Sequence, residues 1–350
     1  MKNRLILFLS IVILSCTDKP TKKKDIAPES IVEKIGVRNA QAMVYHPKES
    51  IVYLFGGANE KEVLSDLWTY TNNHWKKTVT KKSPTPRTFP AITYDEKENR
   101  IIVFGGSKVL FGKESTSKNL LNDTWQFKDG NWKKIATTYA PIPRAESTIV
   151  YDKHRNRIVL FGGYTIKDGN YIKLGDTWEF YNNNWHLVSE TGPTSRHGAP
   201  MIYDSGNKRT ILFGGSTSDK QYGKYKGETW SWNGTQWNRL EIEQPRGVFN
   251  ATMIYNEHKK QLFRFGGWNG NTRINDTWIF SDNTWKQLKT TIQPTSRNHS
   301  SMVYDTKRKK VILFGGHDGE KVFGDTWEFS NNTWKKLIKE KSKKRVKNNH

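Results

Sequence analysis

Residues 311–334 read VILFGGHDGEKVFGDTWEFSNNTW, and this stretch decides the fold. It holds an apolar run, a Gly pair, an alternating Asp-Thr-Trp-Glu-Phe segment, an Asn-rich turn and a second Trp. The same phrase occurs six times, each time with seven residues from the first Trp to the second. The Gly pairs begin at Gly56, Gly105, Gly162, Gly214, Gly266 and Gly315; the Trp pairs are Trp68/Trp75, Trp125/Trp132, Trp178/Trp185, Trp230/Trp237, Trp278/Trp285 and Trp327/Trp334.

Each repeat predicts four strands. In the sixth repeat these are residues 297–304, 311–314, 325–329 and 334–337. The continuous apolar run suits a strand buried on both faces, and the Gly pair ends it. Repeats of about fifty residues with several strands each indicate a propeller. We therefore expect an all-β, six-bladed β-propeller with four antiparallel strands per blade.

Ring closure is expected to differ from a pattern in which the two termini share a blade. The first repeat starts with its own first strand at Arg38, and the last ends with its own fourth strand at Trp334. Closure would then rest on blade 1 packing against blade 6, with residues 31–36 adding an edge segment.

The repeats resemble kelch repeats. The resemblance rests on the apolar run with Gly-Gly, followed by an aromatic residue and then the second Trp. The aromatic residues are Tyr70, Phe127, Phe180, Trp232, Phe280 and Phe329. The Asp-Thr-Trp phrase with a Tyr-Asp hairpin is similar to kelch proteins of bacterial secreted type. The resemblance implies the fold more closely than the function, because such propellers serve many roles.

The N-terminus reads as a targeting segment. Lys2 and Arg4 precede an apolar run, residues 5–14, which is too short to span a bilayer but suits a signal sequence. Residues 13–16 then resemble a bacterial lipobox with Cys16 as the lipidated residue; the alternative is an ordinary signal peptide with an incidental Cys. We expect a lipoprotein signal peptide (1–15), a flexible tether (16–30), a kelch propeller (31–340) and a basic tail (341–350). The protein would be a membrane-anchored lipoprotein of the bacterial cell envelope, facing the periplasm or the cell surface.

Composition and motifs exclude several function classes. The net charge is +23, but Lys is spread through turns and alternate strand positions, and no basic stripe interleaved with aromatics marks a nucleic-acid groove. Cys16 is the only Cys, which excludes an internal disulfide, a thiol nucleophile and the Tyr-Cys crosslink of copper-radical oxidases. No Ser-His-Asp order, P-loop or H-E-x-x-H motif appears, and we expect no metal and no cofactor.

Residues present in every blade are expected to be structural. One set of carboxylates precedes the first Trp by two: Asp66, Asp123, Asp176, Glu228, Asp276 and Asp325. We expect these to cap backbone or to pair with a blade Arg, from the set Arg38, Arg87, Arg144, Arg196 and Arg297. Blade 5 departs from the rule, with Val248 at the Arg position and Arg264 inside its apolar run, where a charge needs a partner.

Function is expected where the blades differ. The loops after the Gly pair and those entering the first strand share one face of a propeller, and the former are longest in blades 2, 3 and 4. Singular residues occupy both loop classes. In ligand-binding kelch domains such positions face the central pocket, so the resemblance implies a ligand site of Tyr164, Trp268, His317, His299, Glu146, Phe89, Arg196 and Arg297. The alternative is structural: Trp268 would anchor a loop, and Glu146 and His299 would make inner-strand hydrogen bonds.

Two functions follow from this reading. The first is a non-catalytic binding module for a glycan or a protein segment, held on the long-loop face. The second is a carbohydrate-active enzyme, such as a sugar mutarotase similar to bacterial kelch proteins that act on sialic acid. Mutarotation needs only an acid and a base, for which Glu146 and His299 are the candidates.

Overall fold

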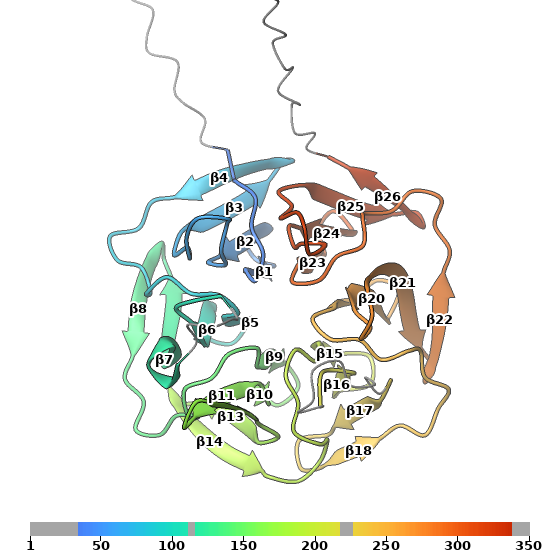
Figure 1. The fold of residues 1–350 in the computed structure, drawn as a ribbon. Helices are drawn as coiled ribbons and strands as arrows, with labels where there is room; N and C mark the ends of the chain where they lie inside the picture. The colour runs from blue at the N-terminus through green and yellow to red at the C-terminus, as the bar shows by residue number, and fades with distance from the viewer. Residues whose placement is uncertain (1–33, 111–115, 218–226, 338–350) are drawn as a thin grey trace, which may run out of the picture. The chain divides into compact units, whose positions relative to one another are not determined.

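The computed structural model describes residues 34–110, 116–217 and 227–337, which belong to one compact unit. Six four-stranded antiparallel sheets stand around a common axis, which confirms the predicted propeller (Figure 1). The expected signal peptide, Cys16, the tether and the tail all lie outside the described residues. Within those residues, no helix is long and apolar enough to cross a bilayer.

Each blade uses its strands in chain order from the axis outward. Blades 1 to 3 comprise β1 Ala42–His46, β2 Ile51–Phe55, β3 Leu67–Thr71, β4 His74–Thr78; β5 Ala91–Asp95, β6 Arg100–Ser107, β7 Leu120–Lys128, β8 Asn131–Ile135; and β9 Thr148–Asp152, β10 Arg157–Phe161, β13 Thr177–Tyr181, β14 Asn184–Ser189. Blades 4 to 6 comprise β15 Met201–Asp204, β16 Arg209–Phe213, β17 Thr229–Trp232, β18 Trp237–Arg239; β19 Thr252–Asn256, β20 Gln261–Trp268, β21 Arg273–Ser281, β22 Thr284–Leu288; and β23 Ser301–Asp305, β24 Lys310–Phe314, β25 Thr326–Ser330, β26 Thr333–Lys336.

Three local features differ from the sequence-based expectation. The first strand of blade 6 begins at Ser301 rather than at residue 297, because His299 has a left-handed backbone (φ 55°) that interrupts extended structure. In blades 2 and 5 the second strand continues through the Gly pair, with a register shift there. The long loop of blade 3 forms a hairpin of its own, β11 Tyr164–Lys167 with β12 Asn170–Lys173. A short 3-10 helix, η1 Ser117–Asn119, precedes β7.

The core lies between the blades. The apolar second strands are nearly inaccessible to solvent, and each core cluster joins two neighbouring blades. The second Trp of a blade packs on the second-strand Phe of the preceding blade, as Trp185 does on Phe104 with ring centroids 4.9 Å apart. Its indole Nε1–H donates to a Thr hydroxyl of that blade, Thr124, at 2.9 Å. The second Trp of each pair is therefore a core residue, as expected, whereas the first Trp is only partly buried in blades 2 to 5.

The repeated Arg and carboxylate residues form buried ion pairs. Arg87 donates to Asp123 through Nη1 and Nη2 at 2.6 and 3.0 Å, and to the Gly105 carbonyl at 3.0 Å. Its backbone carbonyl meanwhile accepts from Gly57 of the preceding blade at 2.9 Å. The residue thus fastens two blades. The equivalent pairs are Arg38–Asp66, Arg144–Asp176, Arg196–Glu228 and Arg297–Asp325.

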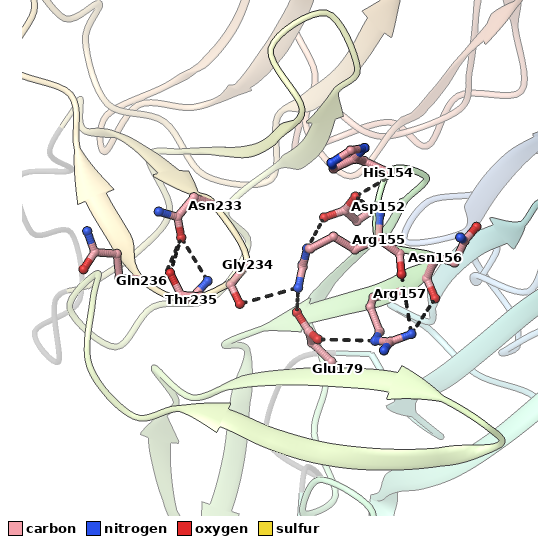
Figure 2. Close-up of polar contacts among 10 residues, drawn as sticks. All are labelled: Asp152, His154, Arg155, Asn156, Arg157, Glu179, Asn233, Gly234, Thr235 and Gln236. Carbon is pink, nitrogen blue, oxygen red and sulfur yellow. Dashed lines mark hydrogen bonds and ion pairs between the residues drawn. The ribbon is translucent and has the colours of Figure 1, made fainter.

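A second set of Arg residues fastens the opposite face. Arg155, in the turn after β9, donates to Asp152 and Glu179 of its own blade and to the Gly234 carbonyl of blade 4 (Figure 2). Three other Arg residues each donate to an Asn in the turn between the third and fourth strands of the next blade. They are Arg100, Arg209 and Arg308. These contacts fasten the opposite end of the axis at four junctions, between blades 2 and 3, 3 and 4, 4 and 5, and 6 and 1.

Candidate functional site

Six residues surround the axis where the chain enters the first strands. We call this ring the collar: Ala40, Phe89, Glu146, Gly198, Asn250 and His299. All six have left-handed backbones, with φ from 51° to 62°, although only one is Gly. Their amides and carbonyls bond around the axis: Phe89 donates to Ala40, Ala40 to His299, His299 to Asn250, Asn250 to Gly198 and Gly198 to Glu146, at 2.7–3.2 Å. This backbone ring holds the collar side chains at one mouth of the central channel.

The loops after the Gly pairs lie beside the collar, as predicted. In every blade the residue after the repeat Arg, or after Val248 in blade 5, forms a β-bridge with the residue after the Gly pair. The bridges include Ala145↔Tyr164, His197↔Ser216, Phe249↔Trp268 and Asn298↔His317. Both loop classes therefore share one face, which we call the collar face.

A continuous polar network crosses the collar from blade 4 to blade 6. His197 Nδ1 lies 2.6 Å from Glu146 Oε2, and Asn250 Nδ2 donates to the same oxygen at 3.2 Å. Asn250 Nδ2 also lies 2.7 Å from His299 Nε2, and His299 Nδ1 lies 3.0 Å from His317 Nε2. Gly198 belongs to this arrangement, because a Cβ there would collide with the Asn250 amide.

The network fixes protonation states. An amide nitrogen can only donate, so His299 Nε2 accepts from Asn250, and Nδ1 carries the proton that is donated to His317. His299 is then neutral, and burial lowers its pKa to about 4. Burial and the neighbouring His299 lower the pKa of His317 to about 3. Burial alone would raise the pKa of Glu146, but His197, His299 and Asn250 hold it below its ordinary value, so this carboxyl is ionised.

A stacked Trp–Arg pair lies on the same face in blade 5. Trp268 and Arg273 are cross-strand partners at the end of the β20–β21 hairpin, and the guanidinium lies 4.9 Å from the indole centroid. Arg273 Nε donates to Asn298 Oδ1 at 3.2 Å. Among the described residues no hydrogen bond or ion pair uses Nη1 or Nη2. The guanidinium of Arg273 is thus held in place on the half-buried ring of Trp268, and we call its Nη1 and Nη2 groups the fork of Arg273.

Beneath the collar the channel widens into a cavity of about 220 Å³. The collar residues and the first strands line it, and its wall mixes apolar side chains such as Met43 and Met201 with polar ones such as Ser147, Thr252 and Ser301. A second cavity of about 320 Å³ lies at the other mouth, lined by Tyr94, Tyr151, Tyr203, Tyr255 and Tyr304 and by Glu96, Lys153 and Glu257.

The structure gathers most of the predicted site residues and removes three from the surface. Glu146, His299 and His317 belong to the network, Phe89 packs edge-on against His299 with centroids 4.9 Å apart, and Trp268 stacks under Arg273. Tyr164 is only 1% exposed, since it is covered by Tyr171 and His197, and it supports the site from beneath. Arg196 and Arg297 are buried in the inter-blade pairs with Glu228 and Asp325, so their guanidiniums present no surface to a ligand.

Sequence reasoning missed His197, Asn250 and Arg273 as site residues. His197 follows the repeat Arg where other blades have Asn, Thr, Ala or Phe. A residue type found in only one blade could have marked it as a site residue. Asn250 stands at a collar position but is an ordinary loop residue by type. Arg273 lies in a loop of the shortest class, where no insertion draws attention to it.

The network can be compared with what a metal site and an acid–base pair would require. Among the described residues, no group of three or more His, Cys, Asp or Glu side chains is placed to hold a metal ion. Glu146 and His299 do converge on Asn250, as an acid–base pair would require. However, an efficient acid or base has a pKa near the working pH, and both pKa values lie below that range.

Comparison with known proteins places the fold in a class and then in a family. The architecture is that of a kelch-type β-propeller. The family model described as "KLHDC2/KLHL20/DRC7 Kelch-repeats domain" matches residues 16–189 and 152–350, and the chain belongs to this family.

Similar proteins include a leucine-zipper-like transcriptional regulator 1 homolog of Drosophila melanogaster, 24% identical over 75% of this chain and 27% of its own length. Kelch domain-containing protein 1 of Mus musculus is 23% identical over 68% of this chain and 66% of its length. Dynein regulatory complex subunit 7 of Chlamydomonas reinhardtii is 27% identical over 41% of this chain and 12% of its length. The chain thus spans less than two thirds of each of these relatives. A kelch propeller suggests a protein-interaction module.

Proposed function

We propose that this chain is a non-catalytic binding module that holds an extended protein segment on its collar face, with an acidic group of that segment seated on Arg273. The observation that carries the proposal is the fork of Arg273, which is held by Trp268 and Asn298 while Nη1 and Nη2 have no partner among the described residues. Paired guanidinium N–H groups match the two oxygens of a carboxylate.

The surroundings of the fork suit such a ligand. Arg273 is partly buried, which lowers its pKa against the opposing effect of Asp318, and a charge-assisted bond is stronger where water is partly excluded. The Gly319 backbone lies directly against Nη1, so a side chain at that position would displace the guanidinium. Half-buried Trp268, Phe89 and His317 supply apolar contact and a polar group nearby, the mixture typical of a binding pocket.

The same proposal includes membrane anchoring through a lipid on Cys16, as the N-terminal sequence predicts. Cys16→Ser should move the full chain from the detergent phase to the aqueous phase in a phase-partition assay. Continued partition of the variant with detergent would contradict lipidation at this residue.

The binding proposal can be tested with a displayed library of random peptides and a glycan array, both probed with the purified chain. Recovered peptides should share an acidic residue. Arg273→Met should weaken their binding at least tenfold, because one partner of a charge-assisted pair is removed. Trp268→Ala should weaken it about thirtyfold, equivalent to about 2 kcal/mol. Arg239→Met, on the exposed edge of blade 4, is the matched control and should leave binding unchanged.

Three outcomes would contradict the proposal. Binding that is indifferent to Arg273 and Trp268 would place the site elsewhere. Selective capture of glycans would replace the protein segment with a sugar ligand. Accelerated mutarotation of sialic acid, abolished by Glu146→Gln, would make the collar a catalytic site.

A further inference from the structure

The outer edge of blade 3 differs from the outer edges of the other five blades. Within the described residues, the fourth strand of each blade is an edge that pairs with another strand on one side only. After its Trp, this strand carries Lys or Arg in five blades: Lys76-Lys77, Lys133-Lys134, Asn238-Arg239, Lys286-Gln287 and Lys335-Lys336. Charged residues, Lys above all, are how proteins prevent one sheet edge from pairing with another. In blade 3 the same positions are His186 and Leu187.

Blade 3 also exposes apolar side chains along this edge. β14 is six residues long, against three to five for the other fourth strands. A register shift opposite Thr177 and Trp178 turns Val188 out of the core, and Leu187 and Val188 are 46% and 37% exposed. The regular part of the strand, residues 184–187, remains available for pairing.

The chain next to β14 extends this apolar rim. Tyr139 is 67% exposed, and its backbone amide donates to Asn184 Oδ1 at 3.0 Å, which ties the connector to the start of β14. Ile142 in the same connector is 50% exposed. Residues 174–195 contain no Lys and no Arg, although the whole chain has 57. The rim of blade 3 is thus an apolar edge without positive charge on a strongly basic molecule.

We propose that this rim binds a second copy of the chain, with the two β14 edges paired antiparallel about a two-fold axis. Such a contact is self-complementary, as an isologous interface requires, and it would join two four-stranded blades into one continuous sheet. The charge pattern favours a second copy at this edge over the other five. Two copies of net charge +23 repel, and pairing any other edge would bring Lys or Arg of both copies together.

Analytical ultracentrifugation of the full chain, in a Cys16→Ser background, tests the proposal. We expect a reversible dimer that becomes tighter between about 0.05 and 0.5 M NaCl, because salt screens the repulsion of like charges. Leu187→Lys should weaken dimerisation at least tenfold. The variant should still fold, because blades 1, 2 and 6 already have Lys at the equivalent position. Gln287→Lys, at the equivalent position of blade 5, is the matched control and should leave the dimer unchanged. A bismaleimide should crosslink Leu187→Cys, in which this Cys is the only thiol.

Three results would each contradict dimerisation through the β14 edge. A monomer at every salt and protein concentration would refute self-association at this edge. Equal weakening by Leu187→Lys and Gln287→Lys would place the interface elsewhere. Association that loosens with salt would indicate contact between oppositely charged surfaces rather than pairing of the two apolar β14 edges. Melting curves of both Lys variants verify that each remains folded.

Discussion

The indole N–H of the second Trp makes a hydrogen bond that recurs at most blade junctions. In five blades its Nε1–H donates to the Thr before the first Trp of the preceding blade, at 2.8–3.3 Å. The sixth case is Trp132, which faces Leu67 of blade 1 in place of a Thr. Trp132 Nε1 is buried and has no hydrogen-bond partner among the described residues. One substitution within the repeat thus leaves one donor unpaired.

This comparison predicts the effect of removing the hydroxyl elsewhere. Thr124→Val keeps the side-chain shape but leaves Trp185 Nε1 without its acceptor, so the free energy of unfolding should fall by about 1–3 kcal/mol. Thr69→Val, on the exposed face of β3, is the control and should change it by less than about 0.5 kcal/mol. Urea denaturation of both variants would check this. Equal stability of Thr124→Val and the parent would show that the indole bonds contribute little.

A second residue-scale prediction concerns acid stability. His299 has a pKa of about 4 in the folded protein, below its ordinary 6.5, so the unfolded chain takes up this proton first as the pH falls. The stability that it contributes is complete above pH 6.5 and is lost progressively down to about pH 4. His299→Gln should therefore reduce the slope of unfolding free energy against pH in this window. The slope should not vanish, because the pKa values of His317 and His46 are also lowered. An unchanged slope would contradict the neutral state of His299.

At the scale of the blade, blade 5 supplies the guanidinium that pairs with its repeat carboxylate from a different position in the sequence. Val248 occupies the repeat Arg position, and Arg264 on β20 places its guanidinium instead 3.4 Å from the Gly266 carbonyl and 3.6 Å from Asp276. These are the counterparts of the groups that Arg87 contacts in blade 2. The contacts are longer, and Nε and Nη2 of Arg264 lack hydrogen-bond partners within the described part of the chain. Burial lowers the pKa of Arg264 to about 10.

Blade 5 therefore predicts a compensating pair of substitutions. Arg264→Leu alone should lower the free energy of unfolding by about 3–5 kcal/mol, because it leaves Asp276 without its cation. Val248→Arg combined with Arg264→Leu rebuilds the arrangement of the other blades and should recover most of that loss. A double-mutant cycle measured by chemical denaturation gives the coupling. Additive effects of the two substitutions would show that the two positions do not supply the same guanidinium.

The elements also show what sequence can and cannot predict here. Blade number, strand order and the Arg–carboxylate pairs were predictable because each feature recurs in phase, so that one repeat checks another. Singular features lack this check. The β11–β12 hairpin carries an Asp168-Gly169 turn, a strong hairpin signal, within a segment that the repeat comparison predicts only as a long loop. The collar network joins Glu146, Asn250 and His299 from three blades, and no spacing along the chain reports a contact of that kind.

At the scale of the whole molecule, the described structure closes the ring without a shared blade. Blade 1 and blade 6 each keep four strands of their own, as expected. The segment before Arg38 adds no strand in its described part, residues 34–37, but Ile35 packs against the apolar cluster between these blades. Trp75 donates to Thr326 across the seam at 2.9 Å, and Arg308 donates to Asn73 at 2.9 Å. The seam thus uses the kinds of contact that most other blade junctions also use.

Arg38 belongs to this seam, and its loss should act on the ring as a whole. Its backbone bonds to Phe323 and Gly316 of blade 6, while its guanidinium pairs with Asp66 of blade 1 at 2.9 Å. Arg144 makes the same contacts between blades 2 and 3, which the chain also connects covalently. Arg38→Ala and Arg144→Ala should each lower the free energy of unfolding by about 1–3 kcal/mol, because each leaves a partly buried carboxylate without its cation. Both substitutions keep the backbone bonds across the junction, but only Arg38→Ala removes the side-chain anchor of that backbone at the one junction that no connector holds.

Hydrogen exchange distinguishes these two variants. In Arg38→Ala the amides of β1–β4 and β23–β26 should exchange by partial opening, before global unfolding, because terminal blades can separate without breaking the chain path. In Arg144→Ala the added exchange should stay near β7, β9 and β13, and the terminal blades should remain protected. If Arg38→Ala raised exchange uniformly over all blades, the seam would be as cooperative as the covalent junctions, and closure would not depend on this residue.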